Sequence, residues 1–395
     1  MDQASDPGRP LEGRKLSMIV DQQRVAAEAG AIEALLAAWQ SRWPESGFLV
    51  LLPEAEKDVV PAIQALSRKH RVPVLGAVFP ALLDGGGFYG EGAWLICFDR
   101  MPGYVLASVR EAGGLGRIVE RLCELQAPVA DGAATPTLFM IFDGMLPNVG
   151  SLVHGIFRRL GERVGYAGVC AGSETFQPMP CLFDGEAFID GAMLGILLPG
   201  EPGAFVVRHD YPVSESLMRA TSADGNRIDQ IDNRPAFDVY QEIIRSEYGV
   251  ALTRDNFYDY AVHYPFGLVT AADVLVRIPV AFGDDGSLFC VGEVAPNSLL
   301  RLLKAPAAGD NTCVADVAGS LNAGRGRTAQ RSLLTFYCAG RRMHFGADAV
   351  GELEQLAQGT GASVLFGALS LGEIDQIDDL GVPRFHNAAL VCAAF

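Results

Sequence analysis

Five polar side chains interrupt the apolar segments at the C-terminal end of the chain: Cys338, Arg341, Glu373, His386 and Asn387. The segments around them consist mainly of Leu, Phe, Val and Ala, which is typical of buried strands. An Arg and a Glu beside a His and an Asn can orient a small polar ligand, because burying such groups without partners is costly. The same residues can equally form a structural network that closes the last strand.

Three histidines lie where an apolar segment meets a turn: His209 in VVRHDYP, His263 in AVHYPFG and His386 in RFHNAAL. Binding sites commonly assemble at strand ends, and imidazole is the most versatile metal ligand. Each of the three is therefore a candidate ligand, with a structural histidine as the alternative. His344 stands in the basic sequence RRMH and is expected at the solvated surface.

Cysteine offers a second kind of chemistry. The eight cysteines are scattered without a CxxC pair, and several stand in apolar runs such as WLICF and LVCAAF. Buried thiols are expected, and neither disulfides nor a zinc site is indicated. Cys338 and His386 can form a thiol nucleophile with its base, so a thiol-dependent enzyme is one hypothesis. A buried cysteine beside a capped strand is the alternative.

Other motifs of known chemistry are absent from the sequence. The run GGGFYGEG at 85–92 precedes a strand, whereas a dinucleotide-binding glycine motif must open a helix. Neither a GxSxG nor an HExxH motif occurs. The sequence therefore indicates no nucleotide site and no familiar hydrolase site.

Composition narrows the class of protein and its partners. A chain of 395 residues with 49% hydrophobic and 20% charged residues is typical of a globular protein of about two domains. The net charge of −16 argues against nucleic acid as a partner. No apolar stretch reaches the roughly 18–20 residues that membrane insertion needs, and the polar N-terminus lacks the features of a signal peptide. We therefore expect a cytoplasmic protein, and a homo-oligomer is compatible with the sequence.

A repeated pattern must position these residues. Segments 48–80, 137–173 and 333–374 each contain an apolar strand, an amphipathic helix, a second strand and a glycine turn. Parallel crossovers within the segments, with hairpins at the Asp-Gly pairs 184–185 and 190–191, predict mixed sheets. The expected fold class is α/β, with two domains whose mixed β-sheets are built from repeated β-α-β-β blocks.

The expected organisation along the chain has three parts. A flexible tail covers 1–20, an N-terminal domain covers 21–203, and a C-terminal domain covers 204–395, where the pattern changes to short strands and turns. The apolar spacing predicts a first helix over 21–42. A second helix is predicted over 235–247, because it opens with Pro-Ala after the capping candidates Asp232 and Asn233.

Several segments together resemble the FIST-domain family of bacterial sensory proteins, which has a FIST N domain followed by a FIST_C domain. The segments that carry the resemblance are VLGAVFP (74–80), GYAGVCAGS (165–173), DGEAFIDGAMLGIL (184–197), ATSADGNRIDQIDNRPAFDVY (220–240), HYPFG (263–267), CAGR (338–341), GEI (372–374) and FHN (385–387). The resemblance extends from about residue 20 to 395. It implies a FIST N domain over 21–203, a FIST_C domain over 204–395, and a sensor of small molecules.

The resemblance also implies a cofactor and a partner. One branch of the family, the nitric-oxide-sensing proteins called NosP, binds haem and regulates a partner histidine kinase. VLGAVFP and the absence of an attached output domain are compatible with that branch, so the resemblance implies haem-based nitric oxide sensing and a separate kinase or other signalling protein. The implied iron ligand is His263, then His209, with His386 in the pocket network. Haem also needs an apolar cleft and cations for its propionates.

Two alternatives accompany the haem hypothesis. The first is a FIST sensor of an amino acid or other small metabolite, which would use Arg341, Glu373, His386 and Asn387 without haem. The second is the thiol-dependent enzyme that would use Cys338. In each case the site is expected in the C-terminal half, where the third block meets the segment that contains the remaining strand-end histidines.

Overall fold

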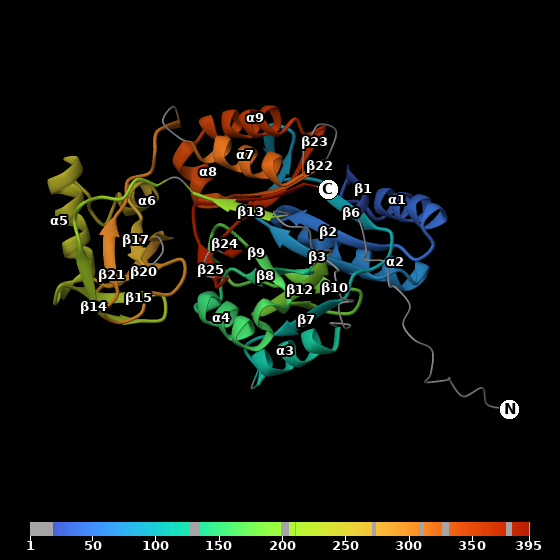
Figure 1. The fold of residues 1–395 in the computed structure, drawn as a ribbon, viewed down its shortest axis with the longest axis horizontal. Helices are drawn as coiled ribbons and strands as arrows, with labels where there is room; N and C mark the ends of the chain where they lie inside the picture. The colour runs from blue at the N-terminus through green and yellow to red at the C-terminus, as the bar shows by residue number, and fades with distance from the viewer. Residues whose placement is uncertain are drawn as a thin grey trace.

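The computed structural model describes residues 19–111, 113–125, 135–198, 205–209, 211–270, 274–308, 312–325, 332–376 and 381–394. Residues 1–18 of the expected tail lie outside this part of the chain, and so does the expected domain boundary between residues 203 and 204. Figure 1 shows two lobes, a large core and a smaller lobe drawn in yellow and orange beside it.

The first block of the core covers residues 19–98. Its elements are β1 (Ile19–Val25), α1 (Ala29–Arg42), β2 (Gly47–Pro53), the 3-10 helix η1 (Glu54–Val59), α2 (Val60–His70), β3 (Val74–Phe79), β4 (Leu82–Asp84), β5 (Gly87–Tyr89) and β6 (Ala93–Phe98). Strands β2 and β3 are parallel and fully buried, as continuous apolar runs predict.

The prediction of a helix over 21–42 was wrong in its first turns. Residues 19–25 form β1, which pairs antiparallel with β6, and the helix begins at Ala29. The main chain of β1 completes the edge of a sheet, and the side chain of Asp21 accepts a hydrogen bond from Trp39 Nε1 at 3.0 Å. Tertiary pairing therefore decided the structure of a segment whose spacing alone favoured a helix.

The second block covers residues 104–198 and repeats the order of the first. Its elements are β7 (Tyr104–Ser108), α3 (Gly114–Leu125), β8 (Thr137–Asp143), α4 (Val149–Leu160), the 3-10 helix η2 (Gly161–Arg163), β9 (Gly165–Ala171), β10 (Leu182–Asp184), β11 (Phe188–Ile189) and β12 (Ala192–Leu198).

One of the two hairpins predicted in this block is present. Strands β10 and β11 form the hairpin around the Asp-Gly pair 184–185. The second Asp-Gly pair, 190–191, does not join a hairpin, because β12 pairs with β7 and β8 instead. Gly191 has φ +55°, and its N–H donates to the buried Oδ2 of Asp143 at 2.6 Å. The turn that this contact holds leads into β12, which belongs to the sheet of β7 and β8.

The third block is split by an insertion. Its elements are β13 (Phe205–Arg208), α7 (Cys313–Arg325), β22 (Ser332–Cys338), α8 (Ala339–Phe345), α9 (Asp348–Thr360), β23 (Val364–Ser370), β24 (Glu373–Gln376), β25 (Pro383–His386) and β26 (Leu390–Ala394). The block follows the order of the other two with one added helix, α8. The confirmed fold class is thus α/β, with mixed sheets built from repeated blocks.

The three blocks interlock by exchanging hairpins. The hairpin β10–β11 of the second block pairs with β3 of the first, β24–β25 of the third pairs with β9 of the second, and β4–β5 of the first pairs with β23 of the third. A glycine faces each incoming strand: Gly76 lies opposite Phe183, Gly168 opposite Ile374, and Gly367 opposite Leu83. Each of these three sheets therefore needs two blocks to reach its six described strands.

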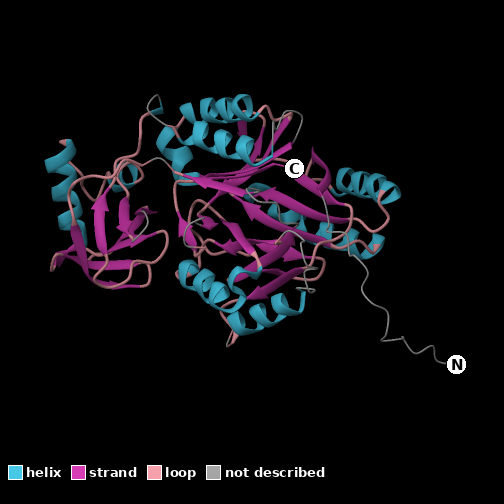
Figure 2. Ribbon diagram, in the orientation of Figure 1, coloured by secondary structure: helices cyan, strands magenta, loops and turns pink. Residues whose placement is uncertain are grey.

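The interior of the core joins the blocks. Phe336 of the third block has its ring centroid 5.5 Å from that of Phe79 and 5.7 Å from that of Phe139, so one phenylalanine from each block meets at the centre. The helices cover the outer faces of the sheets (Figure 2). This packing explains why residues 313–394 belong to the same lobe as residues 19–198, a different division from the expected 21–203 and 204–395.

The smaller lobe is the insert lobe, residues 211–308. Its elements are β14 (Met218–Asp224), β15 (Arg227–Ile231), β16 (Arg234–Pro235), α5 (Ala236–Tyr248), α6 (Phe257–Ala261), β17 (Phe266–Val269), β18 (Val274–Arg277), β19 (Pro279–Phe282), β20 (Leu288–Cys290) and β21 (Leu299–Leu302). Helix α5 confirms the helix predicted over 235–247, and it packs on the antiparallel sheet through Phe237 and Tyr240. The expected side-chain caps are absent, because Asp232 and Asn233 adopt positive φ in a turn.

Candidate functional site

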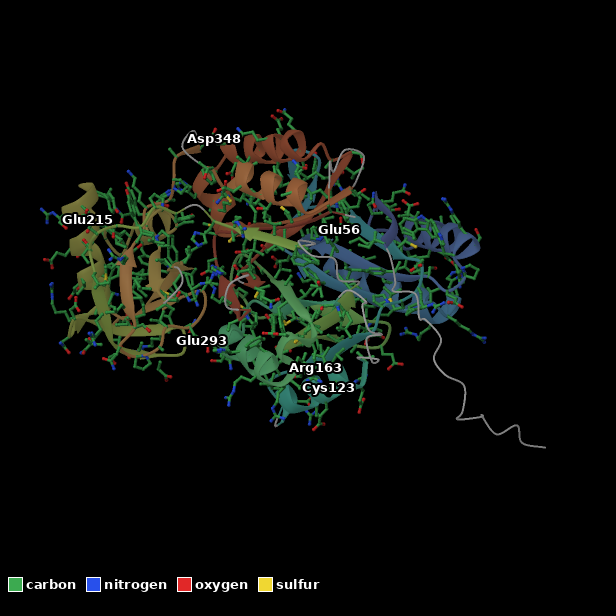
Figure 3. All side chains as sticks on the ribbon, viewed as in Figure 1. Glu56, Cys123, Arg163, Glu215, Glu293 and Asp348 are labelled. Atoms are coloured by element: carbon green, nitrogen blue, oxygen red, sulfur yellow. The ribbon has the colours of Figure 1, made fainter. Side chains whose placement is uncertain are left out.

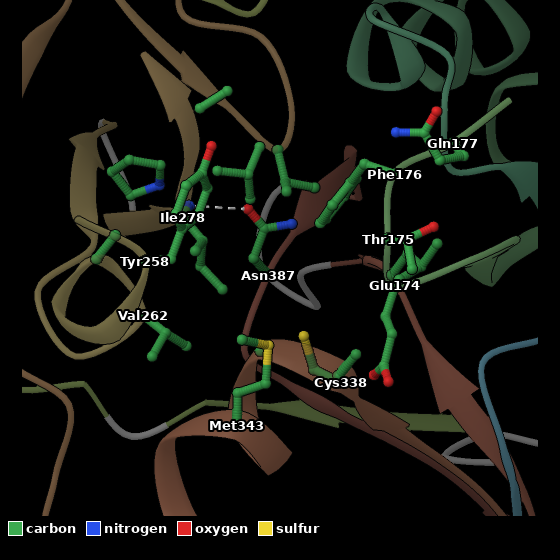
Figure 4. A pocket seen from close by; sticks show the side chains of 18 residues that line it. Glu174, Thr175, Phe176, Gln177, Tyr258, Val262, Ile278, Cys338, Met343 and Asn387 are labelled. Atoms are coloured by element: carbon green, nitrogen blue, oxygen red, sulfur yellow. Dashed lines mark hydrogen bonds between the residues drawn. The ribbon is translucent and has the colours of Figure 1, made fainter. Parts of the chain in front are cut away.

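A cavity of about 510 Å³ lies where the insert lobe meets the core (Figure 4). Three parts of the chain form its wall. The segment 174–177 after β9 comes from the second block. Residues of α6 and β19 come from the insert lobe, and the end of β22 and helix α8 come from the third block. A volume of this size is in the usual range for a small-molecule site.

The wall of the cavity is mainly apolar. Val262 and Ile278 from the insert lobe face Met343 and Leu371 from the third block. Glu174 is the charged side chain in this wall, as far as the structure describes it. An apolar wall with few polar groups is typical of sites for small organic molecules.

Cys338 lies at the end of β22 and lines the cavity, with 2% of its surface exposed. Its Sγ accepts a hydrogen bond from the N–H of Ala388 at 3.1 Å. Burial, and after it the charge of Glu373, raise the pKa of the Cys338 thiol well above its ordinary range. The thiol is therefore protonated at neutral pH, and this form is a poor nucleophile.

Arg341 does not line the cavity, although it follows Cys338 closely in sequence. Its guanidinium is fully buried and donates two hydrogen bonds to Glu352, from Nε at 2.9 Å and from Nη2 at 2.6 Å. Tyr337 donates its hydroxyl to the same carboxylate. This geometry makes Arg341 part of a buried ion pair between α8 and α9.

Glu373 lies on β24 and is also fully buried. Its Oε1 accepts a hydrogen bond from the Ser370 hydroxyl at 2.6 Å, and its Oε2 accepts one from the N–H of Ala389 at 3.2 Å. Burial raises the pKa of Glu373 to about 7. The carboxyl group connects the exchanged hairpin to the last turn of the chain, close to Cys338.

His386 and Asn387 lie side by side in sequence but have different surroundings. His386 Nε2 is 3.0 Å from Asp375 Oδ1, and within the described chain no hydrogen bond joins His386 to Cys338. Asn387 lines the cavity, where its Oδ1 accepts the N–H of Ile278 at 3.3 Å. Of the five residues in the predicted C-terminal set, Cys338 and Asn387 therefore face the cavity.

The histidines form two pairs. The ring of His209, after β13, lies 5.6 Å from that of His386 between centroids. Nδ1 of His263 is 2.6 Å from Nδ1 of His344, and Nε2 of His344 is 2.7 Å from the carbonyl oxygen of Pro306. The predicted surface position of His344 was wrong, because α8 turns this half-buried ring toward the insert lobe.

The haem site predicted from the family resemblance consists of an axial imidazole and cations for the propionates. Within the described part of the chain, no His, Arg or Lys lines the cavity, and no three His, Cys, Asp or Glu side chains cluster as a metal site. The cavity wall therefore supplies neither the imidazole nor the cations of the predicted haem site, and iron ligation by His263 or His209 stays a prediction.

Sequence reasoning missed several cavity residues, among them Glu174, Tyr258 and Met343. Glu174 follows the buried strand β9 within a glycine turn, a position at which a polar residue is a candidate by the same strand-end argument used for the histidines. Tyr258 and Met343 lie on short helices, and their spacing carries no comparable signal. Only the docking of the insert lobe brings them together.

Comparison with protein families identifies the chain. The model of the FIST N domain matches residues 49–234, and that of the FIST C domain matches residues 236–376. The chain belongs to the FIST family. FIST domains are generally small-ligand sensor domains of signalling proteins, and in this FIST protein the cavity draws its wall from both matched regions.

A comparison with curated proteins finds no significant match. Among the helices that the structure describes, none combines the length and apolar character needed to cross a membrane. The two family models meet between residues 234 and 236, where β16 leads into α5 of the insert lobe.

Proposed function

We propose that this FIST protein senses a small molecule in the cavity between its two lobes. The observation that carries the proposal is the origin of the cavity wall. Ile278 comes from the insert lobe, Asn387 from the core, and both face the same space. A ligand that contacts both lobes stabilises one arrangement of them over others, and such differential binding can convert occupancy into a signal.

Polar contacts join the two lobes near the cavity. Arg277 Nη1 donates to the carbonyl oxygen of Phe385 at 3.0 Å, on β25. Glu293 accepts hydrogen bonds from the N–H and the hydroxyl of Ser151 at 2.8 and 2.5 Å, at the start of α4. Figure 3 shows Glu293 at this junction. A bound ligand would add to these contacts and shift the equilibrium between arrangements of the two lobes.

We propose that occupation of the cavity is reported to a separate output protein. We propose a partner of the signalling class in the cytoplasm, with a histidine kinase as the specific candidate that the family suggests. Movement of the insert lobe would change the surface presented to that partner. The position of the cavity supports this proposal, because a ligand bound there would contact both lobes at their junction.

A cavity-filling variant tests the ligand site. Ala281 lines the cavity, so Ala281→Trp should occupy it, whereas Leu217→Trp places the same side chain at a position 53% exposed elsewhere on the insert lobe. Small molecules that raise the melting temperature of the wild type should lose this effect in Ala281→Trp and retain it in Leu217→Trp. Equal stabilisation of all three proteins would contradict the proposal.

Haem-based nitric oxide sensing is a competing proposal supported by the family resemblance alone. Its test is the visible spectrum of protein purified after haem supplementation. A Soret band that shifts in His263→Ala or His209→Ala would support that proposal, and absence of the band would refute it. The thiol-enzyme hypothesis is tested by Cys338→Ala, which would have to abolish a measured turnover.

A further inference from the structure

Glu174 places a carboxylate in the cavity wall with one oxygen lacking a partner. Among the described residues its Oε2 is buried and forms no hydrogen bond. Its Oε1 lies 3.5 Å from Nη2 of Arg342. Figure 4 shows the side chain extending from the 174–177 segment toward the part of the cavity where Cys338 lies.

A carboxylate oxygen can only accept hydrogen bonds, so the Oε2 of Glu174 requires a donor. Leaving such an atom buried and unsatisfied is unfavourable, and more so when it carries charge. The nearby apolar residues of the wall, such as Leu371 and Met343, offer no donor. A ligand that brings an N–H group to this oxygen would supply the missing hydrogen bond and remove the free-energy cost of leaving the oxygen unsatisfied.

The charge of the cavity favours a cationic donor. Glu174 is the charged side chain in the wall, and no Arg, Lys or His of the described chain lines it. Arg342 neutralises part of the charge, but this pair is about one-third exposed on each side, and such pairs interact weakly. Phe176 and Tyr258 add aromatic rings to the wall, which attract cations.

The same arrangement disfavours anionic ligands. Asn387 donates its Nδ2–H to the carbonyl oxygen of His386 at 2.9 Å, and its Oδ1 already accepts from Ile278. The guanidinium of Arg341 is turned away into its pair with Glu352. A carboxylate or phosphate in the cavity would therefore meet Glu174 without a compensating cation.

We propose that the cavity binds an apolar amine in its ammonium form, with Glu174 Oε2 accepting the N⁺–H hydrogen bond and the apolar wall covering the rest of the molecule. This inference rests on the proposed function, because it names the chemical class of ligand for the same cavity. It distinguishes the site from one for amino acids, whose carboxylate would lack a partner here.

A matched series of probes tests the inference. Phenylalkyl amines from benzylamine to 4-phenylbutylamine are compared by calorimetry with the alcohols and carboxylates of the same lengths. At least one amine should bind wild-type protein, its alcohol should bind more weakly, and its carboxylate should not bind. Glu174→Gln should weaken amine binding about ten- to a hundredfold and leave alcohol binding unchanged.

Two further variants sharpen the test. Arg342→Gln removes the competing cation and should strengthen amine binding several-fold. Glu45→Gln removes a carboxylate from an exposed pair with Arg100, distant from the cavity lining, and should change nothing. If an alcohol and its amine bind equally, and Glu174→Gln affects neither, the amine proposal is overturned while the ligand site survives. If no probe of any class binds, the amine proposal is also overturned, and the comparison of Ala281→Trp with Leu217→Trp decides separately whether the cavity is a ligand site.

Discussion

Nδ1 of His263 in the insert lobe lies 2.6 Å from Nδ1 of His344 on α8 of the core. The Pro306 carbonyl oxygen can only accept, so His344 carries a proton on Nε2. When both rings are neutral, Nδ1 of His344 therefore accepts a hydrogen bond from Nδ1–H of His263. One of the two Nδ1 atoms must be free of a proton, so the contact is lost when both rings are charged. Val262 and Met343, the sequence neighbours of the two histidines, line the cavity, so this contact and the ligand site share one junction.

Acidification should weaken the contact between His263 and His344 and so destabilise the junction of the two lobes. Burial, joined for His263 by the charge of His344, lowers the pKa of both histidines below their ordinary value. At His344, Arg341 acts in the same direction, and the Pro306 carbonyl and Glu352 oppose it. Since the unfolded chain then binds protons more readily, stability should fall as pH decreases below about 6.5.

Hydrogen exchange at pH 7.5 and pH 5.5 measures this effect. The protection of residues 257–269 relative to the intrinsic exchange rate at each pH should be lower at pH 5.5 than at pH 7.5 in the wild type, and the difference should shrink in His263→Gln. His154→Gln on α4 is the matched control, because this histidine is exposed. If the difference between the two pH values persists in both His263→Gln and His344→Gln, groups other than these two histidines cause it.

Glu373 should give stability the opposite dependence on pH. Its pKa is raised to about 7 by burial, so the folded state holds a proton that the unfolded state releases near pH 4. This contribution is complete at low pH and is lost as pH rises toward 7. Glu373→Gln retains an oxygen for the Ser370 hydroxyl and should be more stable than the wild type at pH 8.5, by about 1 kcal/mol or more.

Urea unfolding at pH 5.5 and 8.5 measures the change for Glu373→Gln. The advantage of the variant should be smaller at the lower pH, where the folded wild type still holds its proton. If Glu373→Gln is instead less stable than the wild type, and more so at pH 8.5 than at pH 5.5, the folded protein favours the ionised carboxylate.

Arg341 should prove structural. Arg341→Met leaves the Glu352 carboxylate buried without its cation, and breaking a buried pair in this way costs about 3–5 kcal/mol. The double variant Arg341→Met with Glu352→Leu should recover most of the loss. Thermal unfolding measures both, and Arg100→Met, in an exposed pair with Glu45, should have little effect.

The ligand-binding readout separates the two roles of Arg341. Amine or other ligand binding to the folded double variant should match that of the wild type, because Arg341 does not line the cavity. A large loss of affinity without loss of stability would restore Arg341 to the ligand site predicted from the sequence.

Local patterns predicted the blocks because each contains its own hydrophobic periodicity. The first strand of segment 48–80 and helix α5 are determined by residues close in sequence, and both were predicted near their observed positions. The exchange of hairpins was not predicted. Pairing of Leu83 with Gly367 joins residues far apart in the chain, and neither segment contains a signal for the other.

The same distinction applies to the site. The strand-end argument reached Cys338 and Asn387, which face the cavity, because a polar residue in an apolar run is visible in the sequence. It also selected Arg341 and Glu373, whose partners Glu352 and Ser370 satisfy them inside the core. Which buried polar group has a protein partner depends on packing, and sequence alone does not specify that packing.

The glycine at each exchanged hairpin gives a direct test of the interlocked fold. Gly367 on β23 has φ +148°, and a Cβ atom there would lie 1.9 Å from the carbonyl oxygen of Thr335 on β22. Both the backbone conformation and the contact exclude a side chain. Gly367→Ala should therefore destabilise the protein by about 2 kcal/mol or more.

Gly351→Ala is the matched control for this substitution. Gly351 lies in helix α9 with no atom within 4 Å of an added Cβ, so alanine should stabilise the helix by up to about 1 kcal/mol. Hydrogen exchange should locate the damage in Gly367→Ala at β4 and β5 of the first block as well as at β23, because that hairpin pairs with β23. Protection that is lost in the third block alone would mean that the hairpin contributes little to the core, and that the blocks are stable without the exchange.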